Sequence, residues 1–183
     1  MEIGEKYTLN GIVYTIITDD SLEVTKVLEG SNVIIPACLK IDDVTYWVTR
    51  IGEMACFGNC KIVSVTIPDC VKEIGEAAFC SCEALVHINI PEGVRTLAYE
   101  TFYGCESLKE LYLPDCMICI EDRALWYCRN LKSISIPRHL LGIEYTKILP
   151  KRASNGGQCR GMDHLMHCFV RLPSGEIDEL DVE

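Results

Sequence analysis

With 183 residues, the chain is long enough for one domain with a sizeable core. Its 49% hydrophobic and 24% charged residues are ordinary for a folded protein, and its formal net charge of −10 argues against a broad basic face for nucleic acid or anionic membrane. It contains no apolar run of about 18 residues, so we expect no membrane span.

Residues 1–47 carry no repeat and are predicted to form an N-terminal β cap and the half-turn that leads into the repeats. They lack the basic and apolar regions of a secretion signal. Asn10-Gly11 lies between alternating runs and predicts a β-hairpin, and Asp19-Asp20 predicts the next turn before a strand around LEVTKV. The extra nine residues around LKIDDVTYW predict a protruding hairpin.

Residues 48–139 contain one pattern four times, starting at Ile51, Ile74, Leu97 and Ile120. The closing prolines, Pro68, Pro91, Pro114 and Pro137, are each separated by 23 residues. A fixed period in this range is the signature of a solenoid, in which each turn covers the core of the next.

Seven columns at the repeat offset predict the inward side of each turn. They are Val48, Val71, Val94, Met117; Ile51, Ile74, Leu97, Ile120; Ala55, Ala78, Thr101, Ala124; Cys56, Phe79, Phe102, Leu125; Ile62, Leu85, Leu108, Leu131; Val65, Ile88, Leu111, Ile134; and Ile67, Ile90, Leu113, Ile136. The segments SVTI, HINI, ELYL and SISI alternate and predict a stacked parallel sheet. A shorter strand is predicted over VTRI, VKEI, VRTL and MICI, and a helical or 3-10 turn on the opposite edge.

A further column holds a small residue with hydrogen-bonding capacity at one bend of each turn. Its members are Asn59, Cys82, Cys105 and Cys128. A tight bend leaves backbone groups unpaired, and a buried carboxamide or thiol can bond to them. We therefore interpret this column as a structural Asn/Cys ladder rather than a redox or metal site.

The pattern AFxxCxxLxxIxIPxxVxxIG resembles the BspA-type leucine-rich repeat. The segments AAFCSCEALVHINIPEGVRTL and TFYGCESLKELYLPDCMICI carry it best, and NVIIP and DDVTYWVTRIG extend it toward the N-terminus. The resemblance implies a right-handed leucine-rich-repeat solenoid used for protein–protein contact, often in bacterial surface adhesins. The chain departs from the adhesin pattern because it shows no leader and has 12 cysteines.

Residues 140–183 are predicted to form a divergent last turn and a C-terminal cap. Leu140 and Ile143 continue two apolar columns, and HLMHCFVRL, Pro173-Ser174-Gly175 and EIDEL predict a strand, a turn and a strand. Four residues of this region have the donor atoms of a zinc site: Cys159, His164, His167 and Cys168. Their spacing matches no standard site, and adjacent His167 and Cys168 would point opposite ways in a strand, so we expect no metal.

The exposed positions of the predicted sheet are the candidate partner-binding residues. These eight residues, here called the sheet-face strip, are Ser64, Thr66, His87, Asn89, Glu110, Tyr112, Ser133 and Ser135. A tyrosine beside short polar side chains makes an adaptable contact surface. The alternative is a solvated sheet face without a dedicated partner.

No catalytic constellation is predicted. Cys116 and Cys119 form a Cys-x-x-Cys, but on a predicted strand rather than at the helix N-terminus where a thiol pKa is lowered. A lone His87 has no matched nucleophile, Asp42-Asp43 is a turn former, and no Gly-rich phosphate loop occurs. We therefore expect no enzyme activity and no cofactor.

The leading hypothesis is a non-enzymatic protein-recognition or adhesion module that binds through its sheet face. One alternative is a small metal- or thiol-dependent protein using the 159–168 cluster, and another is a structural stacking unit that self-associates through its solenoid ends. Twelve cysteines without a leader favour the cytoplasm, whereas the resemblance favours the bacterial surface. We expect the cytoplasm for the chain as written.

Overall fold

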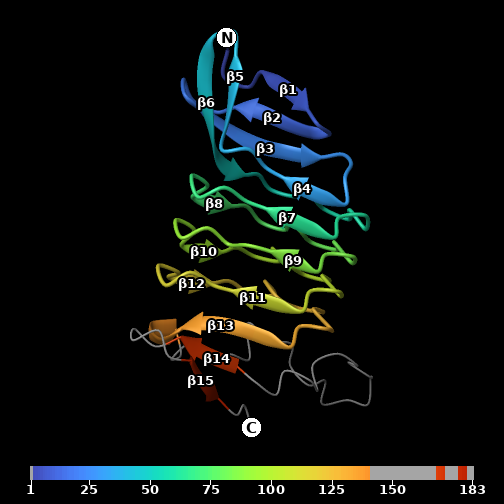
Figure 1. The fold of residues 1–183 in the computed structure, drawn as a ribbon, viewed down its shortest axis with the longest axis vertical. Helices are drawn as coiled ribbons and strands as arrows, with labels where there is room; N and C mark the ends of the chain where they lie inside the picture. The colour runs from blue at the N-terminus through green and yellow to red at the C-terminus, as the bar shows by residue number, and fades with distance from the viewer. Residues whose placement is uncertain (1, 141–167, 172–176, 181–183) are drawn as a thin grey trace.

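The computed structural model describes residues 2–140, 168–171 and 177–180. It is a mainly β solenoid whose turns stack along its long axis, with the N-terminus at one end (Figure 1). No helix in these three ranges has the length and apolar character of a membrane span.

The N-terminal end is a layer of paired strands, as predicted. The hairpin of β1 (Lys6–Leu9) and β2 (Ile12–Ile16) closes at Asn10 and Gly11, whose φ angles of 50° and 74° suit a tight two-residue turn. β3 (Ser21–Val27) pairs antiparallel with β2 and parallel with β6. This layer covers the first turn of the solenoid.

The predicted extra hairpin is confirmed. β5 (Cys38–Ile41) pairs antiparallel with β6 (Val44–Ile51), and Ile41 lies opposite Val44. Asp42 and Asp43 have φ angles of 44° and 65°. Asp tolerates this left-handed region better than most residues, because its short side chain bonds locally to the backbone. The last residues of β6 also form the first short strand of the solenoid.

Each later turn contributes one main strand and one short strand. The main strands are β4 (Asn32–Ile34), β7 (Ser64–Thr66), β9 (His87–Ile88), β11 (Glu110–Tyr112) and β13 (Ser133–Pro137). The short strands are β8 (Glu73–Ile74), β10 (Thr96–Leu97) and β12 (Cys119–Ile120). β4, β7 and β9 form one parallel ladder, β11 and β13 belong to another, and β10 pairs with β12 but not with β8.

The third edge of each turn contains consecutive β-turns instead of the predicted helical or 3-10 turn. We call this edge, residues 54–58, 77–81, 100–104 and 123–127, the turn ribbon. Its N–H groups alternate: Phe79 N–H donates to Thr101 O in the next turn at 2.9 Å, and Cys80 N–H donates to Ala77 O in its own turn at 3.0 Å. Two rows have positive φ: Met54, Ala77, Glu100, Arg123; and Gly58, Ser81, Gly104, Tyr127. A left-handed residue at each end of the five-residue segment excludes a helix.

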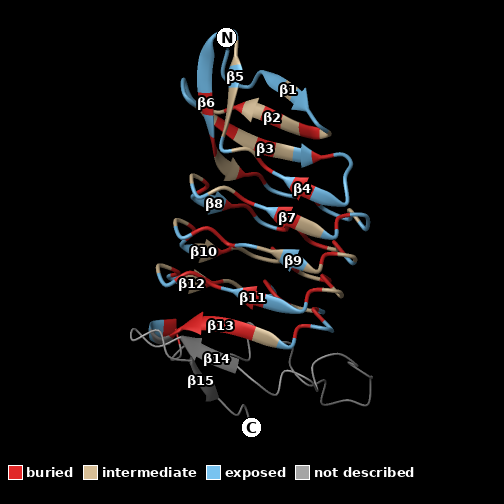
Figure 2. Ribbon diagram, viewed as in Figure 1, coloured by how far each residue is buried: buried red, intermediate tan, exposed pale blue. Residues whose placement is uncertain are grey.

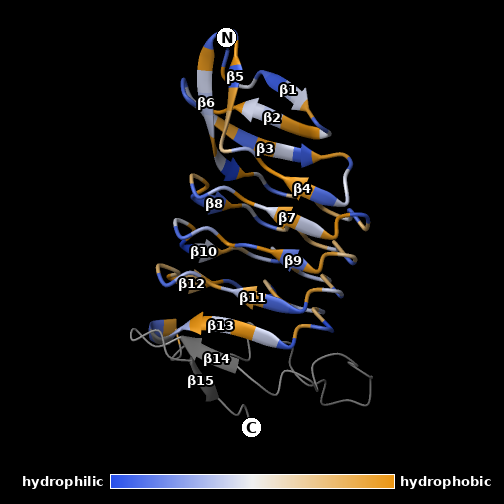
Figure 3. Ribbon diagram, in the orientation of Figure 1, coloured by the Kyte–Doolittle hydropathy of each residue, from blue (hydrophilic) through white to orange (hydrophobic). Residues whose placement is uncertain are grey.

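The seven predicted columns are the core. All their members are buried except Ile88, which is partly buried. In Figure 2 the buried residues recur at equivalent places in successive turns, and Figure 3 shows the matching repeat of apolar residues. Phe79 and Phe102 stack with ring centroids 5.4 Å apart and planes 8° apart, so equivalent residues of neighbouring turns touch directly.

The C-terminal strand pair is also confirmed. A short 3-10 helix (Arg138–Leu140) follows β13 and places Leu140 in the core. β14 (Cys168–Arg171) pairs parallel with β13, and β15 (Ile177–Leu180) pairs antiparallel with β14. The predicted inward position of Ile143 lies outside the described residues.

Candidate functional site

The exposed face of the main strands has a shallow depression over β7, β9 and β11. Its volume is about 360 Å³, and Val65 and Ile88 form part of its lining. The other lining residues are six members of the sheet-face strip: Ser64, Thr66, His87, Asn89, Glu110 and Tyr112. The depression therefore offers polar side chains around a small apolar floor.

Two contacts order parts of this strip. Ser64 Oγ donates to Asn32 Oδ1 at 2.8 Å, and the Tyr112 hydroxyl donates to Glu110 Oε2 at 3.3 Å. Tyr112 nevertheless remains 53% exposed, so most of its ring faces solvent. Its ring is the largest contact surface in the depression.

Asn89 is held by the backbone of the preceding turn. At the end of another main strand, the equivalent inter-turn hydrogen bond joins two backbone groups: Leu113 N–H donates to Ser135 O at 3.0 Å. At the equivalent place, Ile67 N–H donates to the Asn89 side-chain oxygen at 2.8 Å, and Asn89 Nδ2 donates to Ile67 O at 2.7 Å. The Asn89 carboxamide thus replaces backbone in the ladder.

The ladder is interrupted beside this substitution. β9 is the last strand of the β4-β7-β9 sheet, and β11 is the first strand of the next one, although the two follow each other in the stack (Figure 1). The depression spans this interruption, because its lining residues come from both sheets. The candidate site therefore coincides with a discontinuity of the sheet.

The remaining strip positions require one correction and one extension. Ser133 is partly exposed, but Ser135 is only 7% exposed, so Ser135 is not an exposed member of the strip. At the other end, β4 adds Asn32 and Ile34 to the face, and Ile34 is 72% exposed. The match of NVIIP to SVTIP could have located both residues.

The Asn/Cys column forms side-chain bonds to the preceding turn. The three sulfur donors bond at 3.1–3.2 Å and the carboxamide at 3.4 Å, in the pairs Asn59 to Val27 O, Cys82 to Cys56 O, Cys105 to Phe79 O and Cys128 to Phe102 O. Burial raises the pKa of both Cys82 and Cys128 from 9.0 to about 12. These thiols therefore stay protonated and act as donors at neutral pH.

The structure contains a second row of side-chain donors that is not predicted from the sequence, although its members are multiples of 23 residues apart. Cys70 Sγ donates to Val48 O at 3.1 Å, and Cys116 Sγ donates to Glu92 O and Val94 O. His139 Nε2 lies 2.6 Å from Met117 O, which makes it the protonated ring nitrogen. The row is continuous except at Gly93, which has no side chain.

The arrangement of the other candidate groups favours packing over chemistry. Cys116 bonds backbone carbonyls, and Cys119 lies in β12 opposite Thr96. Among the residues that the structure describes, no three His, Cys, Asp or Glu side chains converge for a metal ion. Of the predicted zinc candidates, Cys168 begins β14, whereas Cys159, His164 and His167 lie outside the described residues.

Comparison with known proteins identifies the repeat. The model of the BspA type leucine-rich repeat region matches residues 49–147 in six copies. A leucine-rich repeat protein from Bacteroides ovatus is 35% identical with a TM-score of 0.68, and the match covers 72% of this chain and 35% of that protein. This chain therefore spans about a third of that protein's length.

Two further solved structures have the same architecture. A leucine-rich repeat protein from Bacteroides capillosus is 26% identical, has a TM-score of 0.64 and is matched over 70% of this chain and 96% of its own. The leucine-rich repeat protein of T. pallidum is 25% identical, has a TM-score of 0.59 and is matched over 73% and 72% of the two chains. No curated protein matches this chain.

Proposed function

The chain belongs to the BspA-type leucine-rich repeat family, and from this premise we propose that it is a non-enzymatic module that recognises a partner protein through its sheet-face strip. A leucine-rich repeat suggests a protein-interaction module. The sheet-face strip is our more specific assignment within that class.

The observation that carries this proposal is the depression over β7, β9 and β11. Six strip residues line it, and they combine hydroxyl, carboxamide, imidazole, carboxylate and phenol groups. Protein interfaces of this kind gain specificity from polar groups and affinity from a few aromatic anchors. Tyr112 is the anchor we propose, because its ring is exposed while its hydroxyl is held by Glu110.

The interrupted ladder also supports recognition at this face. A strand pair that is not bonded can adjust its spacing without losing ladder hydrogen bonds, so β9 and β11 can adapt to a partner at low free-energy cost. His87 and Tyr112 lie on opposite sides of the interruption. A partner that contacts both would bridge the two sheets.

Affinity capture from bacterial and host-cell lysates tests the proposal. We expect the double variant His87→Ala/Tyr112→Ala to retain at most about a tenth of the partner captured by the wild type. A matched control is Arg95→Ala/Ile118→Ala, which removes one polar and one exposed apolar side chain near the short strands. Capture that the strip variant leaves unchanged, or that the control removes equally, contradicts the sheet-face assignment.

A further inference from the structure

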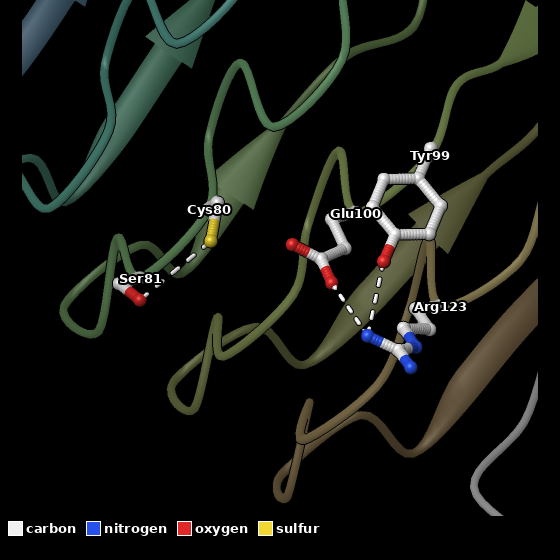
Figure 4. A network of polar contacts seen from close by, with 5 residues as sticks. All are labelled: Cys80, Ser81, Tyr99, Glu100 and Arg123. Atoms are coloured by element: carbon white, nitrogen blue, oxygen red, sulfur yellow. Dashed lines mark hydrogen bonds and ion pairs between the residues drawn. The ribbon is translucent and has the colours of Figure 1, made fainter.

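The turn ribbon displays an aromatic cluster that the fold does not require. We use this name for Tyr103, Trp126 and Tyr127 on the last two turns of the ribbon, together with Tyr99, which immediately precedes the third turn (Figure 4 shows Tyr99). The second repeat has Glu76, Cys80 and Ser81 in the equivalent rows and forms the same inter-turn hydrogen bonds. Backbone geometry therefore does not explain why aromatic rings gather here.

The cluster already binds a cation supplied by the chain itself. The Arg123 guanidinium carbon lies 5.1 Å from the ring centroid of Trp126 and 5.8 Å from that of Tyr99. Its Nη1 donates to the Tyr99 hydroxyl at 3.0 Å and to Glu100 Oε1 at 3.2 Å (Figure 4). These distances are those of favourable cation–π contacts, so the rings are arranged to accept positive charge.

The remaining two rings are accessible on the same edge. Tyr103 and Tyr127 form an edge-to-face pair with centroids 5.0 Å apart, and Tyr127 is 37% exposed. Their mutual contact fixes the ring orientation before any partner arrives. A preordered aromatic pair loses little conformational entropy on binding.

The charge around the cluster is negative. Glu76 and Asp122 are equivalent to Tyr99 in the neighbouring turns, each one residue before the ribbon, and both are exposed. Arg123 is paired with Glu100, so it does not offset these two carboxylates. The chain as a whole has a net charge of −10. A positively charged partner is therefore favoured both at a distance and in contact.

We propose that the aromatic cluster is a second binding surface, which takes an extended segment of a partner protein bearing lysine or arginine side chains. The basic side chains pack against the rings of Tyr103 and Tyr127, on a surface whose surrounding charge is negative. Arg123 occupies the other two ring faces and competes with the incoming cation. This surface lies on the turn ribbon, separate from the sheet-face strip.

Fluorescence anisotropy with a short labelled peptide that alternates lysine with serine tests this proposal, beside a control peptide with glutamine in place of lysine. We expect the lysine peptide alone to bind, and Tyr103→Ala/Tyr127→Ala to weaken it about fivefold although the protein charge is unchanged. The strip variant His87→Ala/Tyr112→Ala should bind the peptide as the wild type does, which separates this surface from the proposed function.

A matched arginine pair sharpens the test. Arg123 and Arg129 each pair with a glutamate, Glu100 and Glu106, so replacing either one by alanine changes the net charge equally. Arg123→Ala also vacates two ring faces, and we expect it to bind the peptide about threefold more tightly than Arg129→Ala. Circular dichroism of each variant verifies the fold.

Three outcomes would overturn the proposal. If the glutamine peptide binds as tightly as the lysine peptide, positive charge has no role in binding. If Arg123→Ala and Arg129→Ala bind the lysine peptide equally, the gain in affinity comes from the change in net charge and not from the vacated ring faces. A dimer of the free wild type by light scattering that the double tyrosine variant abolishes would assign the cluster to a second copy of this chain.

Discussion

The turn ribbon and the main sheet stack the same turns in different ways. In the ribbon, alternate N–H groups bond to the next turn at every step described, including from Ala77, Phe79 and Ser81 to the third repeat. In the main sheet, the ladder stops between β9 and β11. The ribbon is thus the continuous connection of the solenoid, although it contains no regular strand.

This difference teaches that regular secondary structure is a poor guide to what holds a solenoid together. In each of the first three ribbon segments, three N–H groups bond to the next turn and two bond within the turn, so no backbone donor of these segments is left unpaired. The main strands have two to five residues each, and each paired strand is held to its neighbour in the sheet by only the few backbone hydrogen bonds of a short parallel ladder. Their face can consequently accept a residue such as Asn89, whose side chain replaces a backbone group in the bonds to the preceding turn.

The largest expected effect breaks the ribbon's packing. Phe102→Ala removes the ring stacked on Phe79 and should lower the free energy of unfolding by about 3–5 kcal/mol. Phe102→Leu is the control, because Leu125 fills the same row in the next turn, and it should cost about 1 kcal/mol. Urea unfolding measures both. Equal losses would mean that the stacked ring pair has no special role.

The next effect concerns the thiols behind the ribbon. The folded-state pKa of Cys82 and Cys128 is about 12 and the ordinary value is 9.0. Their contribution is complete below pH 9 and is lost as pH rises toward 12, because only the unfolded chain readily releases these protons. Each thiol should cost about 1.4 kcal/mol between pH 8 and 10.

Paired chemical denaturation checks this alkaline loss. Wild type and Cys82→Ala/Cys128→Ala are unfolded at pH 8 and pH 10, and the wild type should lose about 3 kcal/mol more between the two conditions. The comparison cancels titration shared by both proteins, such as that of Tyr14. A parallel decline of the two proteins would show that these thiols do not titrate on unfolding.

A smaller effect tests the left-handed rows of the ribbon. Gly104 has a φ of +71°, and an added Cβ would make only ordinary contact with Ser81 at 3.5 Å. Gly104→Val should therefore cost about 2 kcal/mol through backbone strain alone. Gly104→Asn is the control and should cost less than half as much, since Asn adopts this region readily. Thermal unfolding of both variants would contradict the reasoning if the two shifts were equal.

The smallest effect addresses the interruption in the sheet. Asn89→Ala removes two bonds to Ile67 and should cost about 1 kcal/mol, whereas Thr66→Ala in the same exposed row should be nearly neutral. Hydrogen exchange should show faster exchange of the Ile67 amide in the Asn89 variant alone. Unchanged exchange there would mean that the carboxamide does not protect the ladder.

The sequence predicted the features that a period or a turn dipeptide encodes. The Leu85, Leu108 and Leu131 row is buried as expected, because inward packing demands an apolar residue at every repeat. The Asn10-Gly11 hairpin followed from the conformational preference of those two residues. The strand pair after residue 167 followed from its alternating pattern.

Other features depend on where hydrogen bonds go, which periodicity does not encode. The ribbon resembled one helical turn, because AAF and ALW suit a helix; the left-handed conformations of Ala77 and Arg123 emerge only from stacking. In the repeat pattern Asn89 occupies an ordinary exposed position, because its bonds to Ile67 arise only when the turns stack. Ser135 occupies the same repeat position as Thr66, yet it is buried, and the repeat pattern does not distinguish the two.

The cysteines of the Asn/Cys column have a consequence for how the length of such a solenoid can evolve. Cys82, Cys105 and Cys128 each donate to a carbonyl 26 residues earlier, which lies in the preceding turn because the repeat is 23 residues long. Duplication or loss of a gene segment that encodes one whole turn therefore preserves every kind of contact and alters only the length of the rod. Inserting any other number of residues between neighbouring coils would place these sulfurs opposite the wrong acceptors.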